Sequence, residues 1–272
     1  MVVPWLLRAR VPSLQYATAP EPTLIDTHVH VQATDVTGAT PDVETSSAGY
    51  ASRFAGSAGK YLLQTQSHAI EHVLRGLPPA RALDVGGGHG QLVPLLRRLG
   101  WQVTVHGTDA QCARNLRDVH GLDDCNFVQG GLFELPAADR SFDLVIAVRL
   151  LSHVEQWPRL LAEMCRVASR AVVIDYPTRG GMNSSTGRFL GLKRTVEGNT
   201  RSYISFSHAQ LQRVFAAQGF DKPRRVKQFV LPMFAHRLGK GSAPLRLVEN
   251  LCRTVGITAM VGSPVILRMD RR

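Results

Sequence analysis

Glycine dominates a short stretch, Gly86-Gly87-Gly88-His89-Gly90, that follows an apolar segment and precedes a segment with helical spacing. Because glycine has no Cβ, the backbone can turn sharply here and a ligand can lie directly against the chain. A helix that begins after such a turn also directs its first amide groups at the ligand. The stretch therefore predicts a binding site, with a turn that serves packing alone as the alternative.

Two carboxylates frame this loop and indicate which ligand it takes. Asp109 closes the next apolar segment, 21 positions after Gly88, where a carboxylate can accept hydrogen bonds from both hydroxyls of a ribose. Asp84 precedes the loop, and its charge would repel the pyrophosphate of a dinucleotide, which usually binds a G-x-G-x-x-G loop. The same charge suits an adenosine that carries an ammonium and a sulfonium group. The two acids therefore favour S-adenosylmethionine as the cofactor.

Four segments of the chain form a series of motifs. Leu83–Gly90 joins an acid to the glycine loop, and Val105–Asp109 is an apolar segment that ends in the second acid. Leu135–Val145 contains Leu-Pro and then Phe-Asp, and Leu151–Val154 contains His-Val. In this order they resemble the class I S-adenosylmethionine-dependent methyltransferases of the type 11 group. The resemblance covers residues 80–175 well and is specific for the superfamily, but it does not indicate the methyl acceptor.

The resemblance implies a cofactor pocket built around the glycine loop. The glycines that would shape it are Gly86, Gly88 and Gly90. Asp84 would lie near the methionine amino group, and Asp109 would bind the ribose. The residues that would border the adenine are Ala110, Leu132 and Phe133. Gly131 stands where many relatives have an acid, which weakens any side-chain contact to the adenine amine.

Further contacts would come from two other parts of the chain. Val148 and Arg149 stand at the end of the fourth apolar segment and would line the methionine end of the pocket. Tyr50 and Arg53 belong to a helical segment before the core, and they could contact the methionine carboxylate. The alternative for that segment is an amphipathic helix with a solvated arginine.

Methyl transfer from a sulfonium mainly requires that the acceptor, the methyl group and the sulfur are aligned and that water is excluded. A general base is needed only where the acceptor must lose a proton. The catalytic candidates follow the fourth and fifth apolar segments and are His153, Asp175 and Tyr176. For each of them a purely structural role, in a turn or at a strand end, is the alternative.

Apolar segments alternate with helical segments after residue 80, which predicts an α/β fold with a Rossmann-like, doubly wound sheet. The expected strands are 81–85, 102–107, 126–129, 142–148, 170–175, 224–231 and 264–269. The expected helices are 91–99, 110–119, 157–167, 207–218 and 245–255, preceded by a helical N-terminal cap over 47–77. By resemblance, the last of the seven strands runs antiparallel. We expect residues 1–47 to be a weakly ordered N-terminal extension, 48–272 to be the methyltransferase domain, and about 177–203 to be its lid and acceptor region.

The composition limits which partners the protein could bind and in which compartment it could work. The 272 residues suit one domain, and no apolar run approaches the ~18 residues of a membrane-spanning helix. The four cysteines form no C-x-x-C pair, which favours a reducing compartment, and we expect the cytoplasm. The 32 basic against 21 acidic residues give a net charge of +11, which indicates either an acidic partner or charges scattered over solvated faces. The tract 229–236, followed by Arg237 and Lys240, could be a lipid-facing surface for peripheral membrane association or simply strand six and its turn.

We expect a small-molecule or lipid-like acceptor, with oxygen slightly favoured. Nucleic acid is disfavoured because the chain has no Asn-Pro-Pro-Tyr-like motif, no catalytic-cysteine motif and no appended RNA-binding module. No metal is expected, since the His28-Val29-His30 pair lacks further ligands in context. The rival functions are a nicotinamide-dependent oxidoreductase and a catalytically inactive methyltransferase fold that acts as a binding module.

Overall fold

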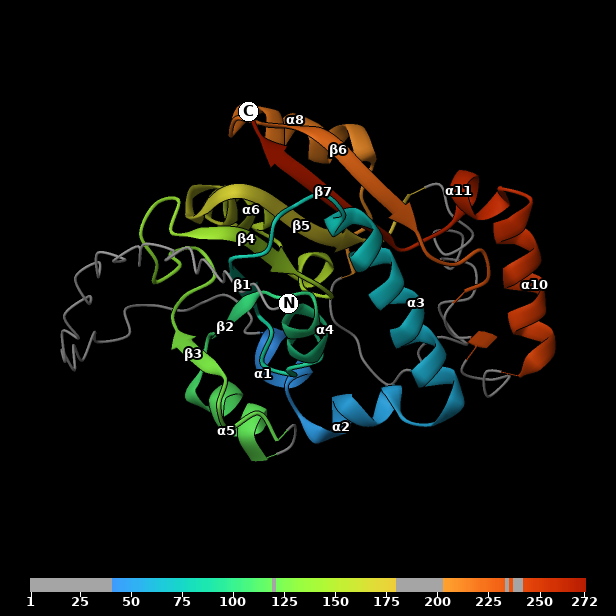
Figure 1. The fold of residues 1–272 in the computed structure, drawn as a ribbon, viewed down its shortest axis with the longest axis horizontal. Helices are drawn as coiled ribbons and strands as arrows, with labels where there is room; N and C mark the ends of the chain where they lie inside the picture. Colours follow the sequence, from blue (N-terminus) through green and yellow to red (C-terminus); the bar gives the residue numbers. More distant parts are fainter. Residues whose placement is uncertain (1–40, 119–120, 180–202, 233–234, 237–241) are drawn as a thin grey trace, which may run out of the picture. The chain divides into compact units, whose positions relative to one another are not determined.

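The computed structural model describes residues 41–118, 121–179, 203–232, 235–236 and 242–272 (Figure 1). Its centre is a seven-stranded sheet of order β3-β2-β1-β4-β5-β7-β6. The strands are β1 Arg81–Val85, β2 Gln102–Gly107, β3 Asn126–Gln129, β4 Phe142–Ala147, β5 Ala168–Tyr176, β6 Phe220–Lys227 and β7 Val265–Arg271. Strands β1 to β5 pair in parallel, and β7 is antiparallel to both β5 and β6. The predicted seven-stranded α/β sheet with an antiparallel last strand is confirmed.

Helices pack against both faces of this sheet. The described helices are α1 Pro41–Thr45, α2 Ala48–Ala51, α3 Gly56–Leu74, α4 Val93–Arg98, α5 Ala110–Asp118, α6 Trp157–Val167, α8 His208–Ala217, α10 Ala243–Thr254 and α11 Ile257–Val261, of which α3, α4, α5, α6, α8 and α11 contact the sheet. Two short 3₁₀ turns, η1 Ser52–Phe54 and η2 Leu151–His153, complete the described elements. In the part of the chain that the structure describes, no helix is long and apolar enough to span a bilayer.

Alternating side chains of the strands build two separate cores. Leu83 and Val145 point to the face that α6 and α8 cover, whereas Ala82 and Leu144 point to the face that α3 and α4 cover. All four are fully buried. Because parallel strands end at the same edge, the carboxyl ends of β1, β2, β4 and β5 meet there. The strand order reverses between β1 and β4, which is where ligands bind in sheets of this kind.

The N-terminal region differs from the expectation in two ways. Residues 41–45, placed in a weakly ordered extension, form α1, because the buried carboxylate of Asp42 accepts hydrogen bonds from the amide and hydroxyl of Thr108 at 2.6 and 2.7 Å. The expected helix over 47–77 is divided into α2, η1 and α3. Gly56, with φ of +71°, starts α3 after the extended Ala55. Residues 1–40 lie outside the described chain.

The sixth strand also differs, since β6 begins at Phe220 and ends at Lys227 instead of covering 224–231. Phe220 already pairs with Arg271 of β7, and a register shift between Asp221 and Arg224 absorbs the irregular residues between them. Phe229 is 1% exposed and Val230 is 9% exposed, so the apolar start of the tract 229–236 is neither a strand nor a lipid-facing surface. Most of the expected lid, residues 180–202, lies outside the described residues.

Candidate cofactor site

The site begins with Asp84, whose side chain is 1% exposed at the carboxyl end of β1. Its Oδ2 atom has no hydrogen-bond partner within the described chain. A Cβ on Gly87 would lie 2.2 Å from that same oxygen, so the carboxylate occupies the space that any side chain at position 87 would need. The glycine run predicted Gly86, Gly88 and Gly90 as pocket residues. The glycine in closest contact with the carboxylate is Gly87, which the sequence reasoning missed.

The other three glycines of the loop are required either by backbone conformation or by close packing. Gly86 and Gly90 adopt φ values of +67° and +63°, which are strained for any residue with a Cβ. At Gly88, the neighbours of an added Cβ would be the side chains of Cys112 at 2.9 Å and Ser46 at 3.1 Å. The middle of the loop therefore packs closely against α5 and the end of α1.

Arg149 lies two positions after β4, on the side opposite the loop at the β1–β4 switch point, which we call the crevice. Its own backbone has φ of +62°, and its amide donates to Asp175 Oδ1 at 2.6 Å. A left-handed conformation at a residue other than glycine is costly and is kept only where its surroundings enforce it. The carboxylate of Asp175 is thus committed to holding the Arg149 backbone in place. The sequence had placed Asp175 among the catalytic candidates.

The guanidinium of Arg149 is only partly satisfied by the protein. Its carbon lies 4.3 Å from the centre of the Phe54 ring, and one terminal nitrogen donates to the Gln91 side chain. The Nε and Nη1 atoms are buried without a partner among the described residues. Buried donors of this kind are normally hydrogen-bonded, so two unpaired donors on one guanidinium indicate a missing acceptor.

Burial is the largest influence on the pKa of both carboxyls in the crevice, Asp84 and Asp175. It raises the pKa of Asp84 from 3.8 to about 7, although the positive charge of Arg149 acts in the opposite direction. It also raises the pKa of Asp175 to about 6, against the hydrogen bond and the charge from Arg149. The protein by itself therefore does not fully stabilise the ionised form of either group.

The carboxyl end of β2 carries the second predicted acid. Asp109 is exposed, and its Oδ1 atom accepts a hydrogen bond from the amide of Gln111 at 2.6 Å at the start of α5. The neighbouring Thr108 is held by Asp42, and Ser46 accepts from Asn115 of α5 at 2.8 Å. The contacts of α1 beside the predicted ribose site were missed because Asp42 and Ser46 belong to a segment without a clear helical period.

The predicted adenine and methionine residues lie around the same edge. Ala110 is the exposed first residue of α5, and Leu132 is buried in the core cluster that includes Leu83. Phe133 is half-buried, with the Arg159 guanidinium carbon 5.0 Å from its ring centre. Val148 is buried on the α3 side of the sheet, so only its backbone is available at the edge.

The N-terminal cap reaches the crevice through an aromatic pair. The Tyr50 and Phe54 rings are 5.6 Å apart, and Phe54 in turn covers Arg149. The side chain of Arg53 lies outside what the structure describes. Phe54, which the sequence reasoning did not single out, is therefore the described link between the cap and the site.

Two of the three catalytic candidates lie in different environments from Asp175. His153 is half-buried in η2, and its ring lies 5.7 Å from that of Tyr203. Tyr176 points to the opposite face of β5 from Asp175, and its hydroxyl pairs with His208 Nδ1 at 3.1 Å. Burial raises the pKa of Tyr176 to about 12, so it stays protonated near neutral pH. Of the three, His153 is the one beside an exposed aromatic side chain.

Comparison with known proteins identifies the fold and the domain. A protein family described as a methyltransferase domain matches residues 83–173, which contain the glycine loop, Asp109 and His153. The structure is similar to magnesium protoporphyrin IX methyltransferase from Synechocystis PCC 6803 with bound S-adenosylhomocysteine, at a TM-score of 0.56, 15% identity and coverage of 86% of this chain and 99% of that one. It is also similar to an S-adenosylmethionine-dependent methyltransferase from Thermotoga maritima, at a TM-score of 0.55 and 16% identity. That match covers 78% of this chain and 91% of the other.

Curated relatives match over shorter lengths. Norajmaline N-methyltransferase from Rauvolfia serpentina is 30% identical over 109 residues, which are 37% of each chain. Malonyl-[acyl-carrier protein] O-methyltransferase from Methylococcus capsulatus is 31% identical over 165 residues, which are 57% of this chain and 56% of that protein. The chain thus aligns with between about a third and just over half of the length of these relatives. Residues 83–173 match a methyltransferase domain, and the chain has the fold of class I S-adenosylmethionine-dependent methyltransferases, as the motifs predicted.

Gly87→Ala tests the packing of the loop against Asp84. The added Cβ would meet the carboxyl group of a side chain that is itself buried, so we expect a loss of about 1–3 kcal/mol of unfolding free energy in urea titrations. Gly131→Ala is the matched control, because nothing lies within 4 Å of its Cβ position and its φ is ordinary. Equal stability of the two variants would contradict the close approach of Asp84 to position 87.

Asp84→Asn tests the raised pKa of the buried carboxyl. A folded pKa above the unfolded one means that stability is fully present below pH ~4 and is lost as pH rises toward 7. The asparagine variant does not titrate, so its stability advantage over the wild type should grow by about 2–3 kcal/mol between pH 5 and pH 8. Urea titrations without cofactor at both pH values measure this. A pH-independent difference would show that the carboxyl titrates normally.

Proposed function

We propose that the protein transfers a methyl group from S-adenosylmethionine to a small-molecule or lipid-like acceptor, with a hydroxyl oxygen favoured. The observation that carries this proposal is the pair of unsatisfied, oppositely charged groups in the crevice. Asp84 Oδ2 lacks a donor, and Arg149 Nε and Nη1 lack an acceptor. The amino acid end of the cofactor carries one ammonium and one carboxylate. The ammonium would donate to Asp84, and the carboxylate would accept from Arg149.

The residues present fit this cofactor along its length. Asp84 would hold the ammonium, Arg149 would hold the carboxylate, and Asp109 would bind the ribose hydroxyls. Phe54 and Gly87 would contribute by closing the crevice over Arg149 and by giving Asp84 room. When bound, the cofactor supplies a methyl group on a positively charged sulfur, which is a good leaving group.

His153 is the candidate that would deal with the proton of a hydroxyl acceptor. It lies at the carboxyl edge of the sheet after β4, and the amide of Ile204 donates to the neighbouring Ser152 carbonyl at 2.9 Å. This contact places residues 203–206 beside His153, where an acceptor could be enclosed between them. Asp175 would serve as a positioning residue through the Arg149 backbone, and the Tyr176 hydroxyl is already engaged by His208.

The relatives support a small-molecule acceptor without selecting the atom. Their names include one N-methyltransferase and one O-methyltransferase, and the structural neighbour from Synechocystis acts on magnesium protoporphyrin IX. Oxygen is favoured here because a hydroxyl gives the imidazole of His153 a proton to accept. The cytoplasmic location remains a prediction from the cysteine pattern.

Cofactor binding is the first test of the proposal. Isothermal calorimetry should show S-adenosylhomocysteine binding to the wild type, and Asp109→Ala and Asp84→Asn should each weaken it by about tenfold or more, because each removes a charge-assisted contact. Urea titrations of the same two variants distinguish lost contacts from lost fold. Binding of NAD in place of S-adenosylhomocysteine would favour the oxidoreductase, and binding without any methyl transfer would favour an inactive binding module.

His153→Gln tests the base. Against the hydroxyl acceptor with the highest turnover in a screen of phenols, hydroxy acids and isoprenoid or fatty alcohols, we expect kcat to fall by about 10²–10⁴-fold with unchanged S-adenosylhomocysteine affinity. Glu155→Gln, an exposed neighbour two positions along the chain, should keep full activity. A wild-type kcat in His153→Gln at every pH would remove this residue from the chemistry.

A further inference from the structure

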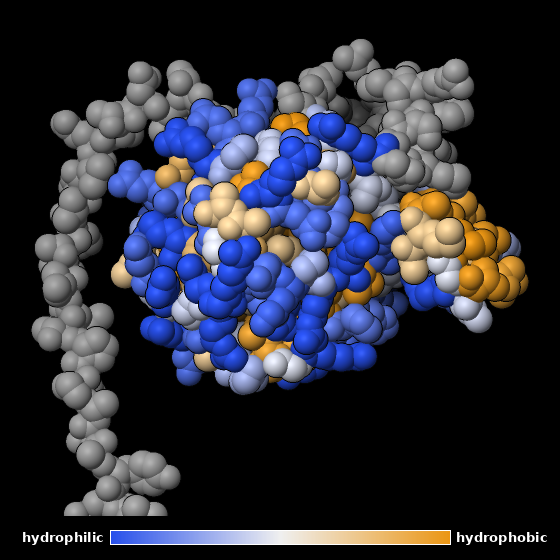
Figure 2. All heavy atoms as spheres, turned by 90° about the horizontal axis from the view of Figure 1, so that it is seen from above, coloured by the Kyte–Doolittle hydropathy of each residue, from blue (hydrophilic) through white to orange (hydrophobic). Residues whose placement is uncertain are grey.

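The described surface concentrates its exposed apolar side chains on α10, α11 and the turn that joins them. Seven large hydrophobic residues there are between 38% and 76% exposed, and they are Leu247, Val248, Leu251, Val255, Ile257, Met260 and Val261. We call them the α10–α11 apolar surface, which forms a continuous orange area on one side of Figure 2. Elsewhere in the described chain, Tyr203 is the only large hydrophobic residue that is exposed. Scattered apolar residues are ordinary on a protein surface, but a contiguous group of this size indicates a binding surface.

Helix α10 is oriented with its polar side toward the protein. Glu249 is fully buried and accepts hydrogen bonds from the amides of Val230 and Leu231 at 3.1 and 2.8 Å, and it pairs with His236 Nε2 at 3.2 Å. Arg246 donates to the Ser57 carbonyl at 3.1 Å. These polar contacts fix the rotation of the helix.

The fixed rotation directs the apolar stripe outward. Leu247, Leu251 and Val255 recur every four positions, which places them on one helix face. A helix that packs on its own core normally buries such a face. Here the face points away from the protein, because the buried Glu249 occupies the inner side.

The charges next to the α10–α11 apolar surface are basic. Between residues 242 and 262 the only acid is Glu249, which is buried, whereas Arg253 of α10 is exposed and Arg246 is held against the protein by the Ser57 carbonyl. The ammonium group of Lys227 donates to the carbonyl of Met260 in α11. An apolar face without a solvent-facing acid on its own two helices complements a layer that is apolar inside and anionic outside.

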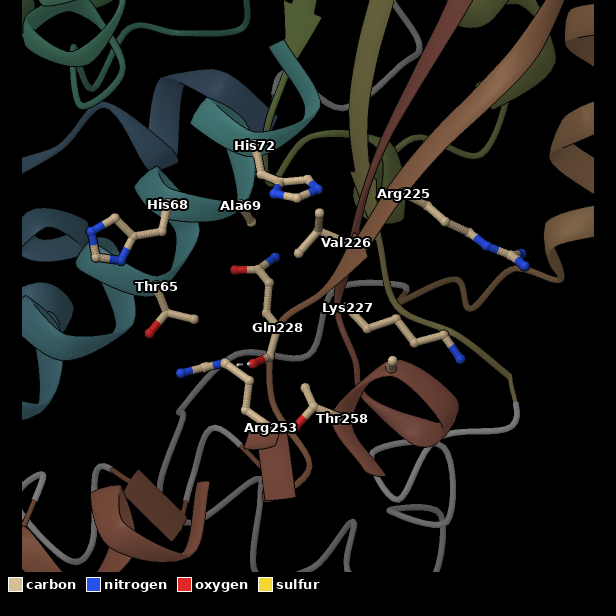
Figure 3. Close-up of a pocket in the computed structure, with 11 residues that line it drawn as sticks. Thr65, His68, Ala69, His72, Arg225, Val226, Lys227, Gln228, Arg253 and Thr258 are labelled. Carbon is tan, nitrogen blue, oxygen red and sulfur yellow. Dashed lines mark hydrogen bonds between the residues drawn. The ribbon is translucent and has the colours of Figure 1, made fainter. Parts of the chain in front are cut away.

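A pocket of about 540 Å³ opens beside this surface, between α3, the end of β6, and the two helices (Figure 3). Its lining includes Arg253, His68 and His72, and no acidic side chain among the described residues. Arg253 reaches the carbonyl of Gln228 at 3.3 Å, while Figure 3 shows Arg225 and Lys227 extending away from the histidines. The pocket therefore offers a cation and several hydrogen-bond donors next to the apolar residues.

We propose that the α10–α11 apolar surface seats the protein on a lipid bilayer that contains anionic lipids, with a headgroup phosphate held in the pocket at Arg253. The apolar side chains enter the boundary between headgroups and acyl chains, and the basic residues remain at headgroup level. The net charge of +11 acts in the same direction at longer range. This inference is independent of the proposed methyl transfer, and it places the membrane contact away from the buried start of the tract 229–236.

Vesicle co-sedimentation of the full chain tests the proposal. The wild type should pellet with phosphatidylcholine vesicles that contain phosphatidylglycerol, and less with phosphatidylcholine alone. Leu251→Ser/Met260→Ser, which removes two exposed apolar side chains without changing charge, should lower the partition coefficient by about tenfold or more. Leu251→Glu/Met260→Glu should lower it further. Both substitutions are at exposed positions, so the thermal unfolding temperature should not change.

Two controls separate lipid insertion and headgroup contact from net charge. Arg117→Ala/Arg213→Ala removes two exposed basic residues on α5 and α8, the same charge change as the double glutamate variant, and should largely keep vesicle binding. Arg253→Ala should lower the preference for phosphatidylglycerol over phosphatidylcholine about threefold to tenfold, more than Arg213→Ala alone does.

Three results would overturn the proposal. The first is a wild type that does not pellet with anionic vesicles. The second is equal pelleting of the wild type and the serine double variant. The third is a wild-type dimer in light scattering that becomes a monomer in the serine variant while neither binds vesicles, because the surface would then contact a second copy of the chain.

Discussion

The buried carboxylate of Asp84 is the constraint on which the whole site depends. It stands at the end of a central strand, where the sheet leaves it almost no solvent and no hydrogen-bond donor for one oxygen. Gly87 must lack a side chain to leave it room, and Arg149 supplies the positive charge that opposes the cost of burial. Arg149 in turn keeps a strained backbone because Asp175 binds its amide. Asp84 is thus linked to Gly87, Arg149 and Asp175 around the carboxyl ends of β1, β4 and β5.

The site is completed by residues outside the segment that matches the methyltransferase family. Residues 83–173 supply the loop, Asp109 and Arg149, but the structure covers this edge with α1, α2 and η1 from further upstream. Asp42 binds the end of β2, and Phe54 packs on the guanidinium of Arg149. The segment that matches the family therefore supplies only part of this edge, and the upstream helices supply the rest.

The C-terminal helix α10 turns its apolar side to the solvent, whereas the core helix α6 turns its apolar side to the sheet. In α6, the apolar residues Leu160, Leu161 and Met164 face the sheet and are fully buried. In α10, a buried acid faces the protein, and leucines face outward. Both helices have comparably amphipathic sequences, so periodicity alone gives the same prediction for each. The difference lies in what the neighbouring backbone offers, since the free amides of Val230 and Leu231 draw Glu249 inward.

Sequence by itself determined the strands β1 to β5, and the family resemblance gave the antiparallel end of the sheet. The sequence also placed Asp84 and Asp109 at strand ends beside the glycine turn, because these features depend on local periodicity and on a fixed spacing. It did not determine the role of Asp42, the need for Gly87, or the unpaired donors of Arg149. Each of these depends on a contact between residues that are distant along the chain or on opposite sides of a turn. The outward face of α10 was likewise decided by tertiary structure, since a helical pattern specifies an apolar stripe but not the side on which a buried hydrogen-bond acceptor is required.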